Sequence, residues 1–429
     1  MIQYMQRKQA FSKIKTCTFL FLFLASPWPA LSSDSQFLSD WRKAFIECVR
    51  IESLSPNLMI RNLTLFSLAS HDCLNQLEPR FETYLQYDQK PPSEPELQAV
   101  LAGCGWTLAK SLHPARLSAF ADLSAFARDR NCSASIKASF LFGSGTAKRI
   151  LQNRRDDGSS TTITYLARSS PGLWRRTPSF YRPPEQPHWR KVRLFALPAG
   201  ENFLPPAPPE PHSETFFQAL REVKEVGSKR SQIRTKEQSF IAEFWKDFSY
   251  SQTPPGHWNK IASFVSRSLK NDLWEEAQLY ALLNVAMADS GIIAWESKYK
   301  YHLWRPVHAI RLADQFPETR SLANSTWEPL LESPPHPEYV SGHSCFSGAA
   351  AEILRRLAGT DQLKFRVDSD RFPGQFRSFE SFSSCTQEIA QSRLYGGIHY
   401  GFSNQTGIET GQRIAGFVFE NKFKALTKE

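Results

Sequence analysis

The sequence lacks long apolar runs after its first 32 residues. No later segment has 18 uninterrupted apolar residues, which is about the length that a membrane-spanning helix needs. Runs of five or more Lys or Arg residues are also absent, and their absence argues against nucleic acid as a partner. We therefore predict a globular protein without nucleic acid and without stable membrane insertion once the N-terminal segment is removed.

Two further patterns are missing. No Cys-x-x-Cys pair and no closely spaced His and Cys ligands occur, so a zinc site is the weaker interpretation of the cysteines. Alternation of apolar and polar residues, which is typical of strands, is nearly absent, and no repeat of fixed length is visible. These absences leave an all-α fold class.

The N-terminal segment has the order of a secretory signal peptide. Four basic residues precede an apolar run over 19–25, and small residues follow at 30–32. We predict that 1–32 is cleaved and that the protein is secreted or periplasmic; an uncleaved anchor is the alternative, although this run is short for a span. Removal leaves 48 basic residues (52 − 4) against 42 acidic ones, and this excess suits anionic ligands.

Six cysteines remain after cleavage, an even number in a chain that we expect in an oxidising compartment. Up to three disulfides are plausible, and the spacing leaves their pairing open. The six are Cys48, Cys73, Cys104, Cys132, Cys345 and Cys385.

The rest of the chain divides into three parts, which we expect to form one compact unit over 33–429. Apolar residues recur at helical spacing over 33–150, whereas 151–232 is rich in proline and aromatic residues and is predicted to be an ordered connection. Helical periodicity returns within 233–429. A helix over 271–300 is apolar almost all round, which predicts a buried central position.

Lys298 and Arg305 are seven residues apart, so a continuing helix would place them on one face two turns apart. Such a pair is usually part of a solvated face. Here the surrounding sequence, from Trp295 to Pro306, is unusually aromatic. Cations among aromatic rings suggest a partly buried anion site.

The segment Ser341-Gly342-His343 runs into a helix that Gly359 can end. Unpaired N–H groups and the helix dipole favour an anion at such a start, and glycine lets the backbone approach it closely. Alternatively, Ser341 is merely a helix cap.

The last cluster contains Arg393 and His399. A helix that starts at Ser383 or Ser384 carries Arg393 on its last turn, and Gly396-Gly397 lets the chain reverse before His399. A capping box at 406–409 is predicted to start the final helix. Together the three clusters predict a site for a tetrahedral oxyanion.

In this order, the clusters resemble the signature shared by vanadium-dependent haloperoxidases and the type 2 phosphatidic acid phosphatase superfamily, namely Lys-x6-Arg-Pro, Pro-Ser-Gly-His and Ser-Arg-x5-His. Other segments are similar to bacterial haloperoxidase-like proteins, and they lie at 61–72, 157–158, 171–174, 234–238 and 253–258. The resemblance therefore covers most of the mature chain and favours the haloperoxidase branch. It implies a helical fold built around two four-helix bundles.

By this resemblance, the cofactor is vanadate. The residues implied to hold it are Lys298, Arg305, Ser341, Gly342, His343, Arg393 and His399, with His399 bonded to vanadium.

The resemblance also implies a reaction and its partners. Hydrogen peroxide would oxidise a halide to hypohalous acid, which halogenates an organic acceptor. His343 and His399 would be the catalytic residues, with His343 as acid and base. Trp295 and His336 stand where relatives place halide-pocket residues, although core and loop roles are equally open. Dimerisation is common among relatives, so a homodimer is possible.

Two alternatives remain open: an acid phosphatase that uses His399 as nucleophile, and a catalytically weak anion-binding descendant. The second is motivated by departures from the family pattern. Val340 replaces a proline and should loosen the approach to the helix. Ser403 and Gly401 replace a frequent Asp and Arg, so the carboxylate that orients His399 would come from elsewhere or be missing.

Overall fold

Helices dominate the structure, a computed structural model that describes residues 33–166, 168 and 170–427. The described helices are α1 Asp34–Ile51, α2 Pro56–Leu77, α3 Leu97–Leu112, α4 Ala121–Arg128, α5 Ala134–Asn153, α6 Glu214–Val226, α7 Lys236–Phe244, α8 Thr253–Leu269, α9 Leu273–Tyr301, α10 Pro306–Arg311, α11 Gly342–Ala358, α12 Phe382–Tyr395 and α13 Gly401–Asn421. The two strands, β1 Gln362–Asp368 and β2 Phe376–Ser381, form an antiparallel hairpin. The prediction of a mainly helical fold is confirmed, and the predicted signal peptide lies outside the described residues.

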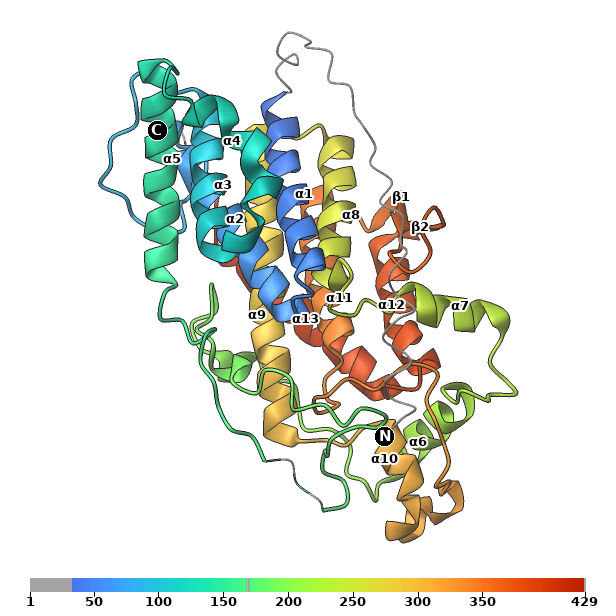
Figure 1. The fold of residues 1–429 in the computed structure, drawn as a ribbon. Coiled ribbons are helices and arrows are strands. Elements are labelled where there is room, and N and C mark those ends of the chain that lie inside the picture. The colour runs from blue at the N-terminus through green and yellow to red at the C-terminus, as the bar shows by residue number, and fades with distance from the viewer. Residues whose placement is uncertain (1–32, 167, 169, 428–429) are drawn as a thin grey trace, which may run out of the picture. The chain divides into compact units, whose positions relative to one another are not determined.

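Helix α9 is the central element (Figure 1, yellow). It packs against α2 on one side and against α11 and α13 on another. A capping box of Asp272 and Glu275 begins it, and His302, with a left-handed φ of 55°, ends it. Among the described helices, α9 alone is long and apolar enough to cross a membrane, yet 94% of its apolar window is buried within the protein. The predicted buried central helix over 271–300 is thus confirmed.

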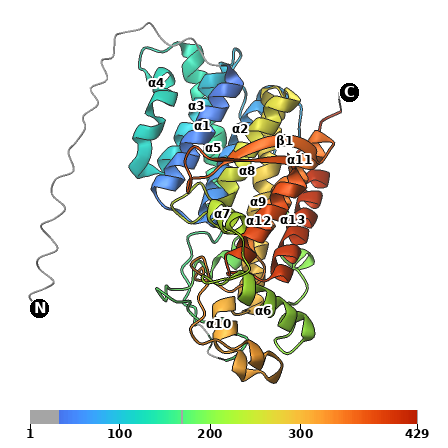
Figure 2. The same cartoon turned by 90° about the vertical axis from the view of Figure 1, so that its right-hand side faces the viewer.

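The described helices form two bundles, and α9 belongs to the second. Helices α1, α2, α3 and α5 form the N-terminal bundle, and α9, α11, α12 and α13 form the C-terminal one (Figure 2). Glycines allow the closest contact in the first bundle, because a Cβ at Gly103 or Gly143 would lie only 2.0 Å from a carbonyl oxygen of the facing helix. The two bundles meet where α2 of the first packs against α9 of the second.

One disulfide occurs among the described cysteines. It joins Cys73 on α2 to Cys104 on α3. The other four described cysteines are free, and they are Cys48, Cys132, Cys345 and Cys385. One bridge lies within the expectation of up to three, and Cys345 and Cys385 are free thiols buried in helices of the second bundle.

The proline-rich connection is ordered because a buried carboxylate of α9 holds it. Asp289 accepts hydrogen bonds from the backbone N–H groups of Phe195, Ala196 and Leu197 at 2.6, 2.9 and 3.0 Å. Burial raises the pKa of Asp289, and these three hydrogen bonds oppose the rise. Three backbone donors that cannot reach water are thereby satisfied by one side chain.

Asp289→Ala should therefore destabilise the protein by about 3 kcal/mol, since it leaves buried N–H groups without acceptors. Urea unfolding monitored by circular dichroism would measure the loss. Asp314→Ala removes an exposed aspartate and is the matched control. A change in Asp289→Ala no larger than in the control would show that the connection is held by other contacts.

Three predictions about local structure are wrong. Helix α6 lies in a stretch where no helix was expected, and the hairpin β1–β2 was missed although Leu363, Phe365 and Val367 alternate with polar residues along β1. The final helix starts at Gly401 rather than at the 406–409 signal. Packing of α13 against α11 extends the helix towards its N-terminus beyond that local cap.

Candidate active site

Residues from four helix ends surround one cavity of about 220 Å³. Six of the residues predicted from sequence line it, namely Trp295, His336, Gly342, His343, Arg393 and His399. Three others, Lys298, Arg305 and Ser341, are fully buried at its edge. We call Lys298, Arg305, Ser341, Gly342, His343, Arg393 and His399 the anion cluster. Segments far apart in the sequence thus meet at one site.

Lys298 and Arg305 approach the cavity from different helices. The helix does not continue from one to the other, because α9 ends at Tyr301 and Arg305 is the N-cap of α10. The left-handed residue His302 and the helix-starting Pro306 produce the break. The turn brings the Arg305 guanidinium within 3.1 Å of the His399 ring.

Lys298 also holds the chain that leads into α11. Its ammonium donates to the Glu338 carbonyl at 2.9 Å and to the Val340 carbonyl, while the Ser297 hydroxyl donates to the Tyr339 carbonyl at 3.2 Å. Val340 is itself fully buried. Side chains of α9 thus hold three successive backbone carbonyls of this segment, where relatives have a proline. A third ammonium N–H remains available to a ligand.

The three cations of the cluster are buried without a counter-carboxylate. In the described part of the chain, their hydrogen bonds go to carbonyl oxygens, to Ser392 and to histidine rings, and they form no ion pair. Burial lowers the pKa of Lys298 well below its usual value and lowers the pKa of Arg305 and of Arg393 to about 10. A bound oxyanion would relieve this electrostatic cost.

Ser341 is the N-cap residue of α11. Its side chain accepts no hydrogen bond from a backbone N–H group of the first turn, so the hydroxyl is not used as a helix cap. The hydroxyl instead accepts a hydrogen bond from the Ser344 hydroxyl at 3.1 Å, so its own proton can be donated. The start of α11 therefore offers a hydroxyl and unpaired N–H groups to an anion.

Gly342 keeps the helix start accessible from the cavity. A Cβ at this position would meet only the Trp295 ring, at 3.5 Å, which is an ordinary contact. Nothing in the protein therefore requires glycine here. The space that a side chain would take belongs to the cavity.

Gly342→Ala should consequently weaken oxyanion binding about tenfold while leaving the stability unchanged or slightly higher, because alanine is the better helix former. Titration calorimetry with orthovanadate and thermal unfolding measure the two effects. Gly359→Ala, at a left-handed position in open space, gives the opposite pattern and serves as control. Unchanged affinity in Gly342→Ala would exclude close approach of the ligand at this point.

Hydrogen bonds determine the proton position on His399. Arg305 Nη1 can only donate, so its 3.1 Å contact makes His399 Nε2 an acceptor. The ring proton then lies on Nδ1, which donates to the Glu338 carboxylate at 2.6 Å. The Tyr400 N–H donates to the same carboxylate oxygen at 3.1 Å. Nε2 is therefore unprotonated, and its lone pair could bond a metal or attack phosphorus once the ligand replaces the hydrogen bond from Arg305.

Glu338 is the carboxylate that sequence reasoning did not assign. It is fully buried, and burial raises its pKa to about 7, against the lowering effect of Arg305 and Lys298. The expected position for such a group was 403, where this chain has Ser403 and where that hydroxyl also lowers the pKa of Glu338. The available signal was an acidic residue within the apolar segment 334–340. Such a residue is expected to be buried, and a buried carboxylate almost always has a partner.

His343 and Arg393 have buried nitrogen atoms aimed at no protein group. Arg393 Nη1 and His343 Nε2 lack hydrogen-bond partners within the described residues. Burial and the nearby Arg393 lower the pKa of His343 well below its usual value, so the ring is neutral and can accept a proton. The described residues contain no cluster of three metal-binding side chains, whereas the orphaned Arg393 donor fits an oxyanion such as vanadate.

Trp295 and His336 form the aromatic side of the cavity, with ring centroids 5.0 Å apart. His336 Nδ1 lies 3.0 Å from Arg305 Nη2, which is a donor, and 3.1 Å from the Pro337 carbonyl oxygen, which is an acceptor. Burial, Lys298 and Arg305 lower the pKa of His336 well below its usual value. A neutral imidazole ring beside an indole ring is therefore built into the cavity.

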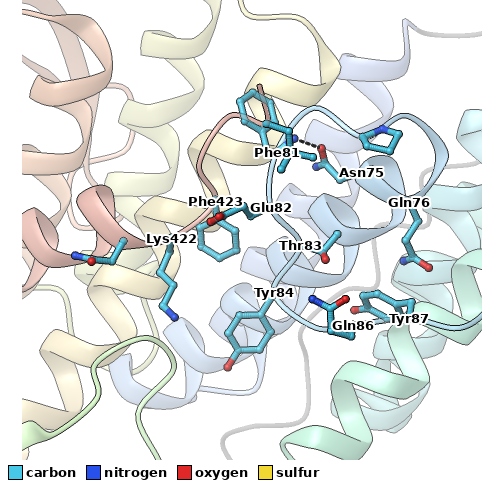
Figure 3. A pocket seen from close by; sticks show the side chains of 13 residues that line it. Asn75, Gln76, Phe81, Glu82, Thr83, Tyr84, Gln86, Tyr87, Lys422 and Phe423 are labelled. Carbon is cyan, nitrogen blue, oxygen red and sulfur yellow. Dashed lines mark hydrogen bonds between the residues drawn. The ribbon is translucent and has the colours of Figure 1, made fainter. Parts of the chain in front are cut away.

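A larger cavity of about 490 Å³ lies between the end of α2, the segment 79–87 and the C-terminal tail (Figure 3). Its polar groups are used within the protein: Asn75 accepts the Phe81 N–H at 2.8 Å, and the Tyr87 hydroxyl donates to Asp72 at 2.7 Å. Among the residues that the structure describes, its lining shares none with the first cavity. We assign no reaction to it.

Sequence comparisons relate the site-bearing part of the chain to known proteins. Residues 278–428 match the family described as the VCPO second helical-bundle domain. The vanadium chloroperoxidase of Curvularia inaequalis is 32% identical over 119 residues, which cover 24% of this chain. The aligned part spans 20% of that relative's length.

Structural comparisons cover nearly the whole chain. The solved structure of a bacterial vanadium-dependent iodoperoxidase matches 92% of this chain and 97% of that chain, with a TM-score of 0.80 and 28% identity. A holo-type bacterial vanadium-dependent chloroperoxidase covers 86% of this chain and 92% of its own, with a TM-score of 0.70 and 18% identity, which shows the fold alone. The predicted haloperoxidase-like fold of two helical bundles is confirmed.

Proposed function

We propose that this chain, which resembles vanadium-dependent haloperoxidases in sequence over 278–428 and in fold, is an enzyme that uses vanadate and hydrogen peroxide to oxidise halide to hypohalous acid. The single observation that carries this proposal is the tautomer of His399. Nε2 is unprotonated because Nδ1 donates to Glu338, and Nε2 accepts a hydrogen bond from Arg305 that a bound oxyanion would replace.

The residues of the anion cluster would have different roles in holding the vanadate. Lys298, Arg305 and Arg393 would neutralise the oxyanion with charge-assisted hydrogen bonds, and Ser341 with the Gly342 N–H would bind it at the helix start. His399 Nε2 would bond the vanadium. When bound, vanadate supplies Lewis acidity that makes peroxide oxygen electrophilic towards a halide.

His343 would be the proton carrier. Its half-buried ring lines the cavity and is neutral, so Nε2 can accept a proton from hydrogen peroxide and return it to the leaving water or to the product. The negative charge of a bound oxyanion would raise the pKa of His343 towards neutrality, where such exchange is efficient.

Halogenation and phosphate hydrolysis should be measured side by side. The same His399 tautomer suits a nucleophile, so an acid phosphatase is the second candidate. The purified protein is loaded with orthovanadate and supplied with peroxide and chloride, bromide or iodide, and halogenation of a diketone dye is followed. We expect halogenation that depends on vanadate. Hydrolysis of an aryl phosphate that vanadate blocks, without halogenation of the dye, would establish the phosphatase instead.

We also propose that the protein is exported. The support is the basic and apolar order of 1–32, followed by small residues at 30–32. N-terminal sequencing of protein from the native host is expected to begin near residue 33, and a mature chain that begins at Met1 would contradict the proposal.

A further inference from the structure

The cavity of the anion cluster has three carboxylates in its wall, at Glu185, Asp247 and Glu332. Two of them are neutralised locally. Asp247 pairs with His257 at 3.0 Å, and Glu332 pairs with Arg182 at 2.7 Å. In the described part of the chain, no hydrogen bond or ion pair reaches the Glu185 carboxylate, so one acid with no partner faces a cavity with three cations at its inner end.

Glu185 is held at this place through its backbone. Its N–H donates to the Pro335 carbonyl at 2.8 Å, and its carbonyl accepts from Trp295 Nε1 at 3.2 Å and from the Tyr299 hydroxyl at 2.8 Å. Both donors belong to the last turns of α9, which also carry Lys298. Three backbone hydrogen bonds thus fix the position of Glu185 beside the site.

The nearest cation along the chain cannot neutralise it, because Arg182 is engaged by Glu332. The charged groups that face Glu185 are therefore Arg182 on its own segment, Lys298 on α9 and Arg305 at the start of α10. They act through space without a direct pair. Burial outweighs them and raises the pKa of Glu185.

We propose that Glu185 is the residue that sets the affinity of this cavity for the halide, a step that deepens the proposed function and rests on it. A bound oxyanion neutralises the positive charge of the anion cluster. No positive charge then offsets the repulsion between an ionised Glu185 and a second anion. An ionised Glu185 repels a halide beside Trp295 and His336, whereas a neutral one admits it and can donate a hydrogen bond.

The test compares Glu185→Gln, which removes the charge, with Glu185→Asp, which keeps it. Glu328→Gln, an exposed acid outside this cavity, is the surface control. In vanadate-loaded protein above neutral pH, Glu185→Gln should lower the KM for iodide about tenfold or more, the scale of one unit charge acting across such a cavity, with kcat within about threefold. In the wild type the KM should rise with pH as Glu185 ionises, and Glu185→Gln should remove that rise.

Calorimetric titration of the vanadate-loaded protein with iodide provides a readout that needs no turnover. Glu185→Gln should bind iodide about tenfold more tightly than the wild type, and Glu185→Asp should behave like the wild type. If no variant halogenates but this difference in binding appears, the proposed function fails and the role of Glu185 stands. If the wild type halogenates and Glu185→Gln matches it in both KM and iodide affinity, the role of Glu185 is refuted.

Discussion

His399→Ala should lower the affinity for orthovanadate by more than about 100-fold and abolish vanadate-dependent halogenation. The substitution removes the ring nitrogen that we assign to the vanadium, and even groups that only support a metal ligand are worth about 10-fold to 100-fold in affinity. It also leaves the buried Glu338 without its 2.6 Å donor. Equilibrium dialysis against orthovanadate measures the loss directly.

The control for this substitution is His212→Ala, at an exposed histidine outside the cavity. Circular dichroism and thermal unfolding of both variants separate loss of the ligand from loss of the fold. If folded His399→Ala retained the affinity of the wild type, the anion cluster would not be a vanadate site, and the His399 tautomer would have no functional meaning.

Glu338→Met should reduce vanadate affinity by about 10-fold to 100-fold, although Glu338 touches no ligand. Methionine has a similar volume but cannot accept the Nδ1 proton of His399 or the Tyr400 N–H. The ring then loses its fixed orientation, and its proton is free to move to Nε2, where it blocks the lone pair. Calorimetry with orthovanadate and the rate of dye halogenation report the effect.

Glu338→Gln separates the hydrogen bond from the charge. Its amide oxygen can accept from both His399 and Tyr400, so the tautomer is kept while the negative charge is lost. We expect an affinity between those of the wild type and Glu338→Met. Equal losses in the two variants would mean that charge alone matters, and no loss in either would show that His399 is oriented by Arg305 without help.

Local signals in the sequence were sufficient for the elements that carry the site. Asp272 and Glu275 begin α9 through a capping box, Gly359 ends α11 in a left-handed conformation, and α9 is apolar on every side. Each of these effects acts within one or two helical turns, so neighbouring residues decide it. Packing against α11 decided the start of α13, and that start was predicted wrongly.

By itself, the sequence determined which side chains could hold a multiply charged oxyanion and on which helix ends they lie, because residue type and helix capping are local properties. Only the tertiary structure decided how they are supported. Glu338 reaches His399 across 61 positions, and Arg305 reaches the same ring across 94. The proton position on His399 and the unpaired charge of Glu185 depend on distances between segments that no spacing along the chain encodes, since burial and partner geometry control both.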